Sequence, residues 1–496
     1  MRTFLIVLLF GMVALASQVS ALDQAEIEVL TELQQQWGAT LDWTGSPSCT
    51  WPGLLCNTDG HVTDLNVANL LLPGSLPENI NQLSYLSFMD VSFNSLSGPL
   101  PTTLGALTNL TVLRLNVNLF SGTIPSSLAQ LHLLEELPLD NNQLGGSIPS
   151  QLFSMRSLTS LTLSGNQLSG VIPATLSSSV RLGTLDLASN NLSGTLPALP
   201  ATLSALSLAD NHLSGRLDVL SALPSLSLLD LHGNRFGGPL PALALSSQRS
   251  LIGVDLSDNA LSGSVSGWLS NATQLQLLNL SSNAITGGFP VDLSLRTVVS
   301  LDLSNNPLGG SLPSVFGSCE SLTALDLSSC RLVGAFPAAL VQRATALQLL
   351  DVSFNKLTGT LPSELSRLIS LRRLHLNGNQ LSGALPSLVD MSQLVDVNLS
   401  HNRFTGTVPH YWNSKPFLRN IDLSFNELTG SIPSSPPLSP LGVLFLQSNR
   451  LDGLLPEWVC DYQHLASYNF QDNLWQCPLP ACCNHRGSAL GEPCVA

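Results

Sequence analysis

Leucines and polar residues recur in one pattern along most of the chain, from Leu65 to Asn473, with a spacing of almost always 23 to 25 residues. The full pattern reads L-x-x-L-x-L-x-x-N-x-L-x-G-x-(I/L/F/V)-P, and Leu113–Pro125 and Leu374–Pro386 are clear copies. The segment L-x-L predicts a short strand with one buried face, because side chains alternate between the two faces of a strand. Equivalent strands of successive copies would pair side by side, which predicts a long parallel sheet.

One asparagine in each copy follows the predicted strand, where the chain must turn sharply. An amide both donates and accepts hydrogen bonds, so a column of asparagines can satisfy backbone groups that the turn would otherwise bury unpaired. Cys330 holds this slot in one copy and Leu70 holds it in the first. The Gly suits a tight backbone position, and the Pro suits an extended one without a donor. The asparagines of the series are Asn94, Asn118, Asn142, Asn166, Asn190, Asn211, Asn234, Asn259, Asn283, Asn306, Asn355, Asn379, Asn402, Asn426, Asn449 and Asn473.

Self-similarity at roughly 20–29 residues with this spelling is the signature of the leucine-rich repeat. Each copy can bury its leucines only against its neighbours, which predicts an α/β repeat solenoid. We expect a horseshoe or superhelix with a parallel β-sheet on the concave face and disulfide-bonded terminal caps. The expected divisions are a signal peptide at 1–21, an N-terminal cap at 22–64, about 17 coils at 65–456, and a degenerate last repeat with a Cys-rich cap at 457–496.

The first residues indicate export. Met1-Arg2 precedes the apolar run Phe4–Ala16, and Val19-Ser20-Ala21 supplies the small residues that a signal peptidase needs, so we expect cleavage after Ala21. No later stretch is continuously apolar over the roughly 18 residues of a spanning helix. We therefore expect a secreted, extracellular protein that does not insert into the membrane after cleavage and that would reach a cell surface only through a partner.

The cysteines fit an oxidising compartment and gather at the ends of the repeat array. We expect Cys49 to pair with Cys56. The five C-terminal cysteines allow two bridges, whose connectivity stays open: Cys460, Cys477, Cys482, Cys483 and Cys494. Cys319 and Cys330, in the middle of the array, could form a bridge or redox site, but buried thiols are the favoured interpretation.

Five N-x-S/T triplets are candidate glycosylation sites in an exported protein, at Asn109, Asn191, Asn271, Asn279 and Asn398. Asn279 and Asn398 lie between two strand leucines and are expected to face outward from the inner sheet, where a glycan would exclude a large ligand.

Composition excludes several function classes. Charged residues are only 10% of the chain, and the formal net charge is −14, which argues against nucleic acid and anionic membrane as partners. The chain has no H-E-x-x-H, G-x-S-x-G or phosphate-loop motif, and its nine histidines are scattered. We expect no enzyme activity, no cofactor and no metal site.

Three stretches resemble the plant-type extracellular leucine-rich repeat family, which includes receptor-like kinase ectodomains, receptor-like proteins and polygalacturonase-inhibiting proteins. The first is Cys49–Cys56, C-T-W-P-G-L-L-C, followed by Gly60-His61-Val62. The repeat body has the class-specific half L-x-G-x-(I/L)-P, as in Leu428–Pro433, and Asn473–Cys482 resembles the closing motif of the family. The Cys482-Cys483 doublet has no counterpart in that motif. The resemblance implies a recognition protein.

On such folds the inner sheet presents the variable positions beside the strand leucines. A run of aspartates there could form an acidic stripe, but L-D-L-S-x-N is generic, and the carboxylate could bond a serine of the neighbouring coil. A set of arginines, histidines and aromatic residues breaks this spelling and is the predicted binding patch, although ordinary drift on a solvated face would also produce it. The patch comprises Phe354, Arg372, Arg373, His375, Asp396, His401, Arg419, Asp422, Phe425 and Phe445. A smaller candidate patch contains Arg114, Glu135 and Glu136.

Three functions stay open on this reasoning. The first is an exported recognition protein that binds a protein or peptide ligand on the concave face, acting with a membrane receptor partner in signalling or defence. The second is an inhibitor of a secreted cell-wall-degrading hydrolase. The third is a structural coat or adhesion protein.

Overall fold

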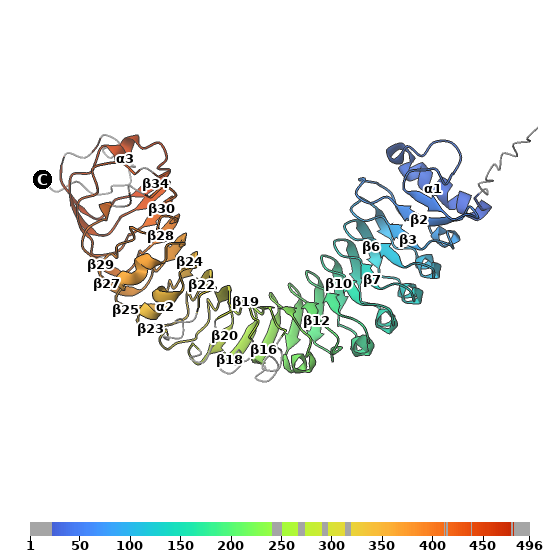
Figure 1. Ribbon diagram of the computed structural model, residues 1–496, viewed down its shortest axis with the longest axis horizontal. Helices are drawn as coiled ribbons and strands as arrows, with labels where there is room; N and C mark the ends of the chain where they lie inside the picture. The colour runs from blue at the N-terminus through green and yellow to red at the C-terminus, as the bar shows by residue number, and fades with distance from the viewer. Residues whose placement is uncertain are drawn as a thin grey trace, which may run out of the picture. The chain divides into compact units, whose positions relative to one another are not determined.

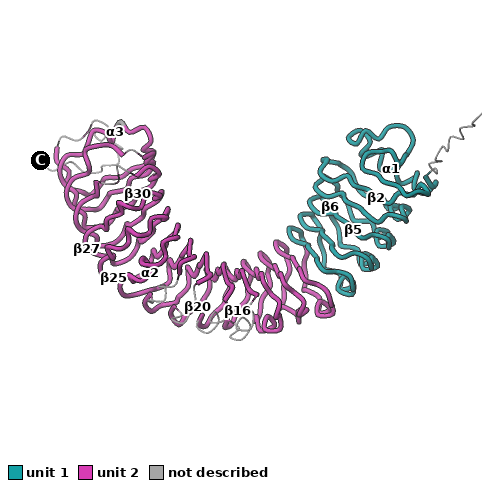
Figure 2. Tube along the Cα trace, in the orientation of Figure 1, with its two compact units in different colours: residues 1–167 teal, residues 168–496 magenta. Residues whose placement is uncertain are grey.

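The computed structural model describes residues 22–240, 250–265, 273–289, 296–312, 319–410, 412, 415–437, 439–477 and 480. The expected signal peptide and Asn271, Cys482, Cys483 and Cys494 lie outside these ranges. The chain divides into two compact units, Met1–Gln167 and Leu168–Ala496 (Figure 2).

Unit 1 begins with helix α1 (Gln24–Leu41). Its apolar residues recur at helical spacing and bury one face; they are Val29, Leu30, Leu33, Trp37 and Leu41. Beyond the helix, the ring of Trp43 stacks on that of Trp51 with centroids 4.8 Å apart. These rings close the end of the first coil.

The predicted disulfide between Cys49 and Cys56 is confirmed, with the two Cα atoms 5.8 Å apart. Strand β1 (Leu54–Cys56) ends at this bridge and pairs antiparallel with β2 (Val62–Asn66). The bridge therefore ties the loop after α1 to the edge of the first coil.

The L-x-L segments form parallel strands, as predicted, and we call the sheet that they build the inner sheet (Figure 1). In unit 1, β2 pairs with β3, β3 with β5, and β7 with β9. The remaining inner strands of unit 1 are β3 (Phe88–Asp90), β5 (Val112–Arg114), β7 (Glu136–Pro138) and β9 (Ser160–Thr162). Those of unit 2 are β11 (Thr184–Asp186), β13 (Ala205–Ser207), β15 (Leu228–Asp230), β17 (Gly253–Asp255), β19 (Leu277–Asn279), β21 (Ser300–Asp302), β22 (Ala324–Asp326), β24 (Leu349–Asp351), β26 (Arg373–His375), β28 (Asp396–Asn398), β30 (Asn420–Asp422), β32 (Val443–Phe445) and β34 (Ser467–Asn469).

The L-x-G half of the repeat forms a second set of parallel strands, which the sequence reasoning did not predict. In unit 1 these are β4 (Ser97–Pro99), β6 (Leu119–Thr123) and β8 (Gln143–Gly146). The others are β10 (Gln167–Gly170), β12 (Asn191–Thr195), β14 (His212–Gly215), β16 (Arg235–Pro239), β18 (Ala260–Ser264), β20 (Ala284–Thr286), β23 (Val333–Ala335), β25 (Lys356–Thr360), β27 (Gln380–Ala384), β29 (Arg403–Thr405), β31 (Thr429–Gly430), β33 (Arg450–Gly453) and β35 (Leu474–Trp475). The repeat glycine in these strands adopts positive φ, as at Gly122, with φ of 74°. This backbone conformation explains the glycine, because residues with a Cβ adopt it rarely.

Short helical turns complete many coils after the repeat proline. Two are α-helices in unit 2, α2 (Ala338–Arg343) and α3 (Trp458–Asp461). Within the described ranges, the 3-10 helices are Ile80–Gln82, Thr102–Ala106, Ser126–Gln130, Ser150–Ser154, Ala174–Ser178, Asp218–Ala222 and Ser363–Arg367. None of the helices in the described ranges is both long enough and apolar enough to cross a membrane.

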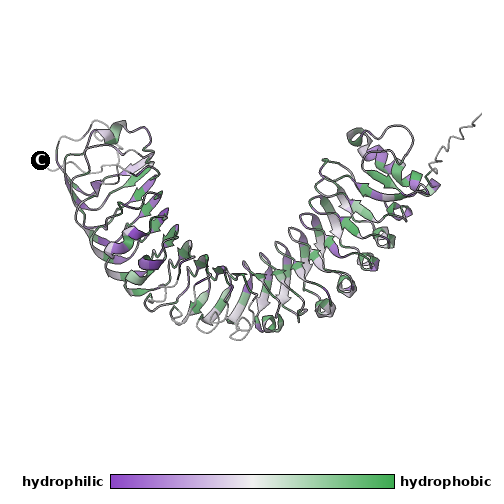
Figure 3. Ribbon diagram, in the orientation of Figure 1, coloured by the Kyte–Doolittle hydropathy of each residue, from purple (hydrophilic) through white to green (hydrophobic). Residues whose placement is uncertain are grey.

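The core is a stack of leucine layers. In the coil of β5, for example, Leu113 of the strand and Leu115 just after it are fully buried, and Phe120 of β6 in the same coil joins them. Hydrophobic residues recur in this way coil after coil in each unit (Figure 3). Because each layer packs on the next, no single coil has a core of its own.

The predicted asparagine column is confirmed. Asn118 donates from Nδ2 to the carbonyls of Leu115 and Asn116 in its own coil and of Val91 in the preceding coil, at 3.0–3.3 Å. Its Oδ1 accepts the backbone N–H of Leu96 at 3.0 Å. One amide thus satisfies four backbone groups and joins two coils.

The two exceptional slots share one solution. At Leu70 and at Cys330, the next asparagine accepts two N–H donors instead of one. Asn94 Oδ1 accepts from Leu70 and Leu72, and Asn355 Oδ1 accepts from Cys330 and Leu332, at 2.8–3.0 Å. The following coil therefore compensates for the missing amide.

Candidate functional site

The inner sheet of unit 2 presents two solvent-facing rows. In most strands the middle residue is buried, and the first and third face outward, as in Arg373, Leu374 and His375 of β26. Parallel pairing aligns these positions from coil to coil. One row contains Arg373, Asp396 and Asn420, and the other contains His375, Asn398, Asp422 and Phe445. The strand residues of the predicted binding patch are thus brought side by side.

His375 lies between two carboxylates. Its Nδ1 is 3.2 Å from Oδ2 of Asp351 in β24, and its Nε2 is 3.5 Å from Oδ2 of Asp396 in β28. Hydrogen bonds to Asp351 and Asp396 raise the pKa of His375 to about 9. The imidazole is therefore protonated at neutral pH, and its positive charge is balanced by the carboxylates beside it in the patch. Asp351, which the sequence reasoning treated as generic, is part of this cluster.

The two carboxylates remain ionised beside this cation. Burial alone would raise the pKa of Asp351, but hydrogen bonds from His375 and Ser353 outweigh burial and lower it. The pKa of Asp396 is lowered in the same way against burial, by His375 and Asn420. With one cation and two anions, the cluster keeps a net negative charge.

An aromatic strip runs along the ends of the same strands. The residue before each asparagine of the column has positive φ, and most of these positions hold Gly, Asn, Asp or Ser. Phe354, His401 and Phe425 occupy the same position with φ of 53–56°. The ring of His401 stacks on that of Phe425 with centroids 4.1 Å apart, and Phe354 and Phe425 are 62% and 43% exposed. Bulky residues rarely adopt this backbone conformation, so neither the backbone nor the core explains the rings.

The arginines of the patch divide between two places. Arg372 and Arg419 precede β26 and β30 and line a hollow of about 1020 Å³ at the beginning of the strands, whereas Arg373 is on the sheet itself. Exposed Ile369 and Phe417 line the same hollow and were missed by the sequence reasoning. Among the described residues, no ion pair within 4.0 Å involves Arg372, Arg373 or Arg419.

The smaller predicted patch of unit 1 is also brought together. Arg114, Glu135 and Glu136 line one hollow of about 300 Å³. Arg114 is bound within the unit, because its Nη1 lies 3.3 Å from Oδ2 of Asp90.

The expectation that a strand aspartate bonds a serine of the neighbouring coil was wrong. Oδ1 of Asp422 accepts the backbone N–H and the hydroxyl of Ser424, two residues later in the same coil, at 3.0 and 2.6 Å. Asp255 and Ser257 form the same pair. A carboxylate can reach a donor two residues ahead more easily than the neighbouring coil, and this local bond holds the strand end. The row of aspartates therefore has a folding role, apart from any partner.

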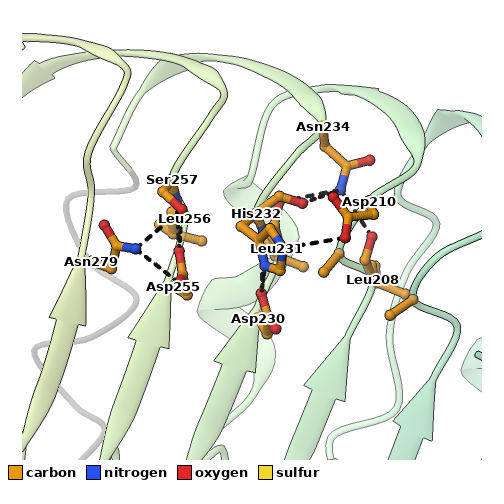
Figure 4. A network of polar contacts seen from close by, with 12 residues as sticks. Leu208, Asp210, Asp230, Leu231, His232, Asn234, Asp255, Leu256, Ser257 and Asn279 are labelled. Atoms are coloured by element: carbon orange, nitrogen blue, oxygen red, sulfur yellow. Dashed lines mark hydrogen bonds and ion pairs between the residues drawn. The ribbon is translucent and has the colours of Figure 1, made fainter. Parts of the chain in front are cut away.

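A second polar network lies further along the inner sheet of unit 2 (Figure 4). His232 lies between Asp230, at 2.7 Å from Nδ1, and Asp210, at 3.4 Å from Nε2. Burial lowers the pKa of His232, but the hydrogen bond to Asp230 and the nearby carboxylates outweigh burial and raise it. Asp230, His232 and Asp255 have potential ligand atoms within 4.8 Å of one another, which would allow a metal ion. Both ring nitrogens of His232 already face carboxylates.

The two cysteines in the middle of the array, Cys319 and Cys330, are buried, in agreement with the favoured interpretation. Cys330 is a buried thiol that donates to the carbonyls of Leu303 and Ser328, at 3.1 and 3.4 Å, and burial raises its pKa to about 12. Cys319 is buried as well. Cys460 and Cys477 are both disulfide-bonded. The C-terminal connectivity stays a prediction.

The candidate glycosylation sites differ in their surroundings. Asn109 and Asn191 are exposed, and Asn398 is half-buried on the inner sheet. Asn279 donates from Nδ2 to Asp255 and Ser257, at 3.0 and 3.2 Å (Figure 4). A glycan on Asn279 would replace one of these donor hydrogens.

Known proteins share the repeat and the fold of this chain. The sequence pattern of the family Leucine Rich Repeat matches residues 109–131, 157–179, 274–295, 297–319, 346–368, 370–390 and 417–437. The rice (Oryza sativa subsp. japonica) Brassinosteroid LRR receptor kinase BRL3 is 42% identical over 86 residues, which are 16% of this chain and 7% of that kinase. The chain thus spans a small part of that kinase.

Two solved structures are similar over most of the chain. The plant peptide hormone receptor RGFR1, in complex with RGF2, superposes with a TM-score of 0.73 at 28% identity, over 87% of this chain and 81% of that one. A TDR receptor superposes with a TM-score of 0.73 at 30% identity, over 83% of this chain and 80% of that one. The chain belongs to the leucine-rich repeat family and is homologous to plant leucine-rich repeat receptor kinases and to the ectodomains of plant peptide hormone receptors.

Proposed function

We propose that the protein is an extracellular recognition protein that binds a protein or peptide ligand on the inner sheet of unit 2, through the predicted binding patch. The observation that carries the proposal is the exposed stack of His401 on Phe425. These rings occupy a backbone position that favours small or polar residues, and they leave apolar surface in water without adding to the core. Recognition of a partner would account for both features.

Charge supports the same assignment. Arginines and aromatic residues are the side chains that most often anchor interfaces. Arg372 and Arg419 extend around a hollow that also contains exposed Phe417, so this edge offers both cations and apolar surface. The adjacent cluster of Asp351, His375 and Asp396 is negative, as worked out above. A ligand that fits this surface carries an acidic group toward the arginines and a basic group toward the cluster.

The comparisons are consistent with this role, because the similar receptor RGFR1 is a peptide hormone receptor. The Cys49–Cys56 bridge and the expected signal peptide support an extracellular location. We include in the proposal that the protein acts with a membrane receptor partner in signalling or defence.

The test is affinity capture from the surface and medium of the producing organism. The baits are the purified full chain and the variant Arg372→Glu/Arg373→Glu/Phe425→Ala. A matched control is Arg156→Glu/Arg403→Glu/Phe93→Ala, in which the arginines are exposed and Phe93 has the same left-handed position in unit 1. Circular dichroism and thermal melting must first show that all three fold alike. A partner that wild type and control retain and the patch variant loses would support the proposal, with the affinity then measured on the purified partner.

The other outcomes discriminate between the alternatives. A polysaccharide hydrolase that is captured and inhibited in proportion to added protein would favour the inhibitor function. Equal capture by all three baits, or capture only of further copies of this chain, would remove the patch from consideration and favour a structural role.

A further inference from the structure

A recess of about 400 Å³ lies on the inner sheet of unit 2, away from the predicted binding patch. Its floor is one row of aligned strand positions, in which Ala205, Leu228, Gly253, Leu277 and Ser300 are in register. The row thus places a glycine between two leucines.

Gly253 forms the floor of the recess between these leucines. Its backbone conformation is one that other residues adopt, so no turn requires a glycine here. A Cβ at this position would lie 3.2 Å from Cδ2 of Leu228 and 4.0 Å from Cβ of Leu277. Leu228 therefore already contacts the buried glycine closely, and the open part of the recess lies above Gly253, between Leu228 and Leu277.

The leucines on either side have no evident role in folding. Leu228 and Leu277 are 51% and 50% exposed, although fully buried Leu231 and Leu280 of the same coils already fill the core. A leucine on a solvent-facing row keeps much of its surface in water, which is unfavourable unless a partner covers it.

The neighbouring row makes one wall of the recess acidic. Asp230 and Asp255 belong to this wall and lie two residues along their strands from Leu228 and Gly253, about 6.6 Å at the usual rise. Asp210 and His232 lie beside the two aspartates (Figure 4), and Asp186 lines the same recess. Even with His232 protonated, aspartates outnumber cations here.

We propose that this recess binds a peptide segment in which an aliphatic or aromatic side chain packs between Leu228 and Leu277, above Gly253, while a neighbouring Lys or Arg of the segment pairs with Asp230 and Asp255. The inference rests on the proposed function and specifies the ligand chemistry. The charge of the wall selects a basic peptide over an acidic one or a neutral apolar molecule. The recess and the arginines of the patch are about 24 Å apart along the stacked strands, which an extended peptide of about eight residues spans.

The experiment is a selection of phage-displayed random peptides on the purified full chain. Peptides enriched on wild type are then synthesised with a fluorescent label, and their Kd values are measured by fluorescence polarisation. The first test variant is Gly253→Leu, which obstructs the recess; the backbone conformation accepts a leucine, although Leu228 must shift to make room for the added Cβ. Its matched control is Ser467→Leu, which adds the same side chain to the same row on β34. The second is Asp230→Asn/Asp255→Asn, with Asp452→Asn on an outer strand as control.

The expected result is a set of peptides that share an apolar residue close to Lys or Arg. Gly253→Leu should weaken their binding at least about tenfold, and Ser467→Leu should leave it unchanged. Asp230→Asn/Asp255→Asn should weaken these peptides and have no effect on analogues with Gln in place of the basic residue. Salt should weaken the first group more than the second.

Other results overturn the inference. Selected peptides without the apolar–basic pairing, equal binding to Gly253→Leu and wild type, or no enrichment on wild type would each do so. Peptides that Arg372→Glu/Arg373→Glu/Phe425→Ala loses and Gly253→Leu retains would refute the recess while supporting the proposed function. Peptides lost only by Gly253→Leu would support the recess and refute the patch.

Discussion

The Nδ1 atom of His375 lies 3.2 Å from the Oδ2 atom of Asp351, which is on the preceding coil. On the other side, Asp396 of the following coil faces the Nε2 atom of the same ring. The protonated imidazole therefore lies between two carboxylates, one from each neighbouring coil, which would otherwise repel each other. The cluster links stability to pH and determines the charge that a ligand meets.

Stability should depend on the protonation of His375. The folded-state pKa of about 9 exceeds the unfolded value of about 6.5. The stabilisation is therefore fully present below pH of about 6.5 and is lost as the pH rises through about 9. We expect His375→Gln to lower the free energy of unfolding by about 1–2 kcal/mol at the lower pH and to have no such effect above the folded pKa.

Urea denaturation of wild type and variant on both sides of this window measures the difference. His132→Gln is the control, since that residue is exposed and belongs to no such cluster among the described residues. A loss of stability in His375→Gln that stayed constant with pH would contradict the protonated cluster.

The exposed aromatic strip should contribute to binding more than to stability. Phe354 is 62% exposed and has φ of 54°, where asparagine is more favourable. We expect Phe354→Asn to leave the free energy of unfolding unchanged or to raise it by about 0.5 kcal/mol. The same substitution should weaken binding of the captured partner.

Thermal melts and partner affinity would be measured on the same preparations. Phe404→Asn is the contrast, because Phe404 is fully buried and its replacement should cost about 3 kcal/mol or more. If Phe354→Asn destabilised the protein as strongly as Phe404→Asn, the ring would have a folding role instead.

A buried lysine stabilises three coil carbonyls. Lys415 is 2% exposed, and its Nζ donates to Leu388, Val389 and Met391 at 2.6, 2.7 and 3.1 Å. Lys415→Met would leave these acceptors without that donor, and we expect a loss of about 3 kcal/mol. Lys356, which is the only other lysine of the chain, is exposed, so Lys356→Met should change stability little.

Amine acetylation of the folded protein offers an independent measurement. Mass spectrometry should find Lys356 modified and Lys415 protected until the chain is unfolded. Equal modification of the two lysines in the folded protein would show that Lys415 is accessible.

The thiol of Cys330 should be inert. With its pKa raised to about 12 by burial, against an ordinary 9.0, the reactive thiolate is suppressed roughly a thousandfold at neutral pH, and access is blocked as well. Iodoacetamide should therefore label Cys330 only after denaturation, as followed by mass spectrometry. Rapid labelling in the folded state would revive the interpretation of this position as a redox site.

Much of the fold could be predicted because the repeat expresses it locally. The buried leucines Leu113 and Leu115, the turn asparagine Asn118 and the Cys49–Cys56 bridge all have the roles expected from their spacing. The second sheet was missed because L-x-G-x has no clear alternation of polar and apolar residues, and its strands form only by pairing with the next coil. The serine partner of Asp422 was misassigned because the pattern does not show whether a bond stays within a coil.

The residues of the candidate site could be predicted because they are unusual in the repeat, but their interactions with one another could not. Arg373, His375 and Asp396 stand out from the repeat spelling. Nothing in the spelling shows that His375 is held between Asp351 and Asp396, or that Arg372 lines a hollow together with Phe417. The recess around Gly253 was not anticipated, because a glycine and two leucines line one recess only when their strands are aligned.

The sequence by itself determined the period, the buried leucines and the asparagine column, because each depends on residues within one copy or on the same position in the next. Only the tertiary structure decided which side chains become neighbours across coils. Residues about 24 positions apart along the chain lie one strand spacing apart in the sheet, about 4.8 Å. Charge pairing at His375, stacking of His401 on Phe425 and the recess at Gly253 all arise at that short distance, where the identity of each neighbour matters and the repeat pattern does not specify it.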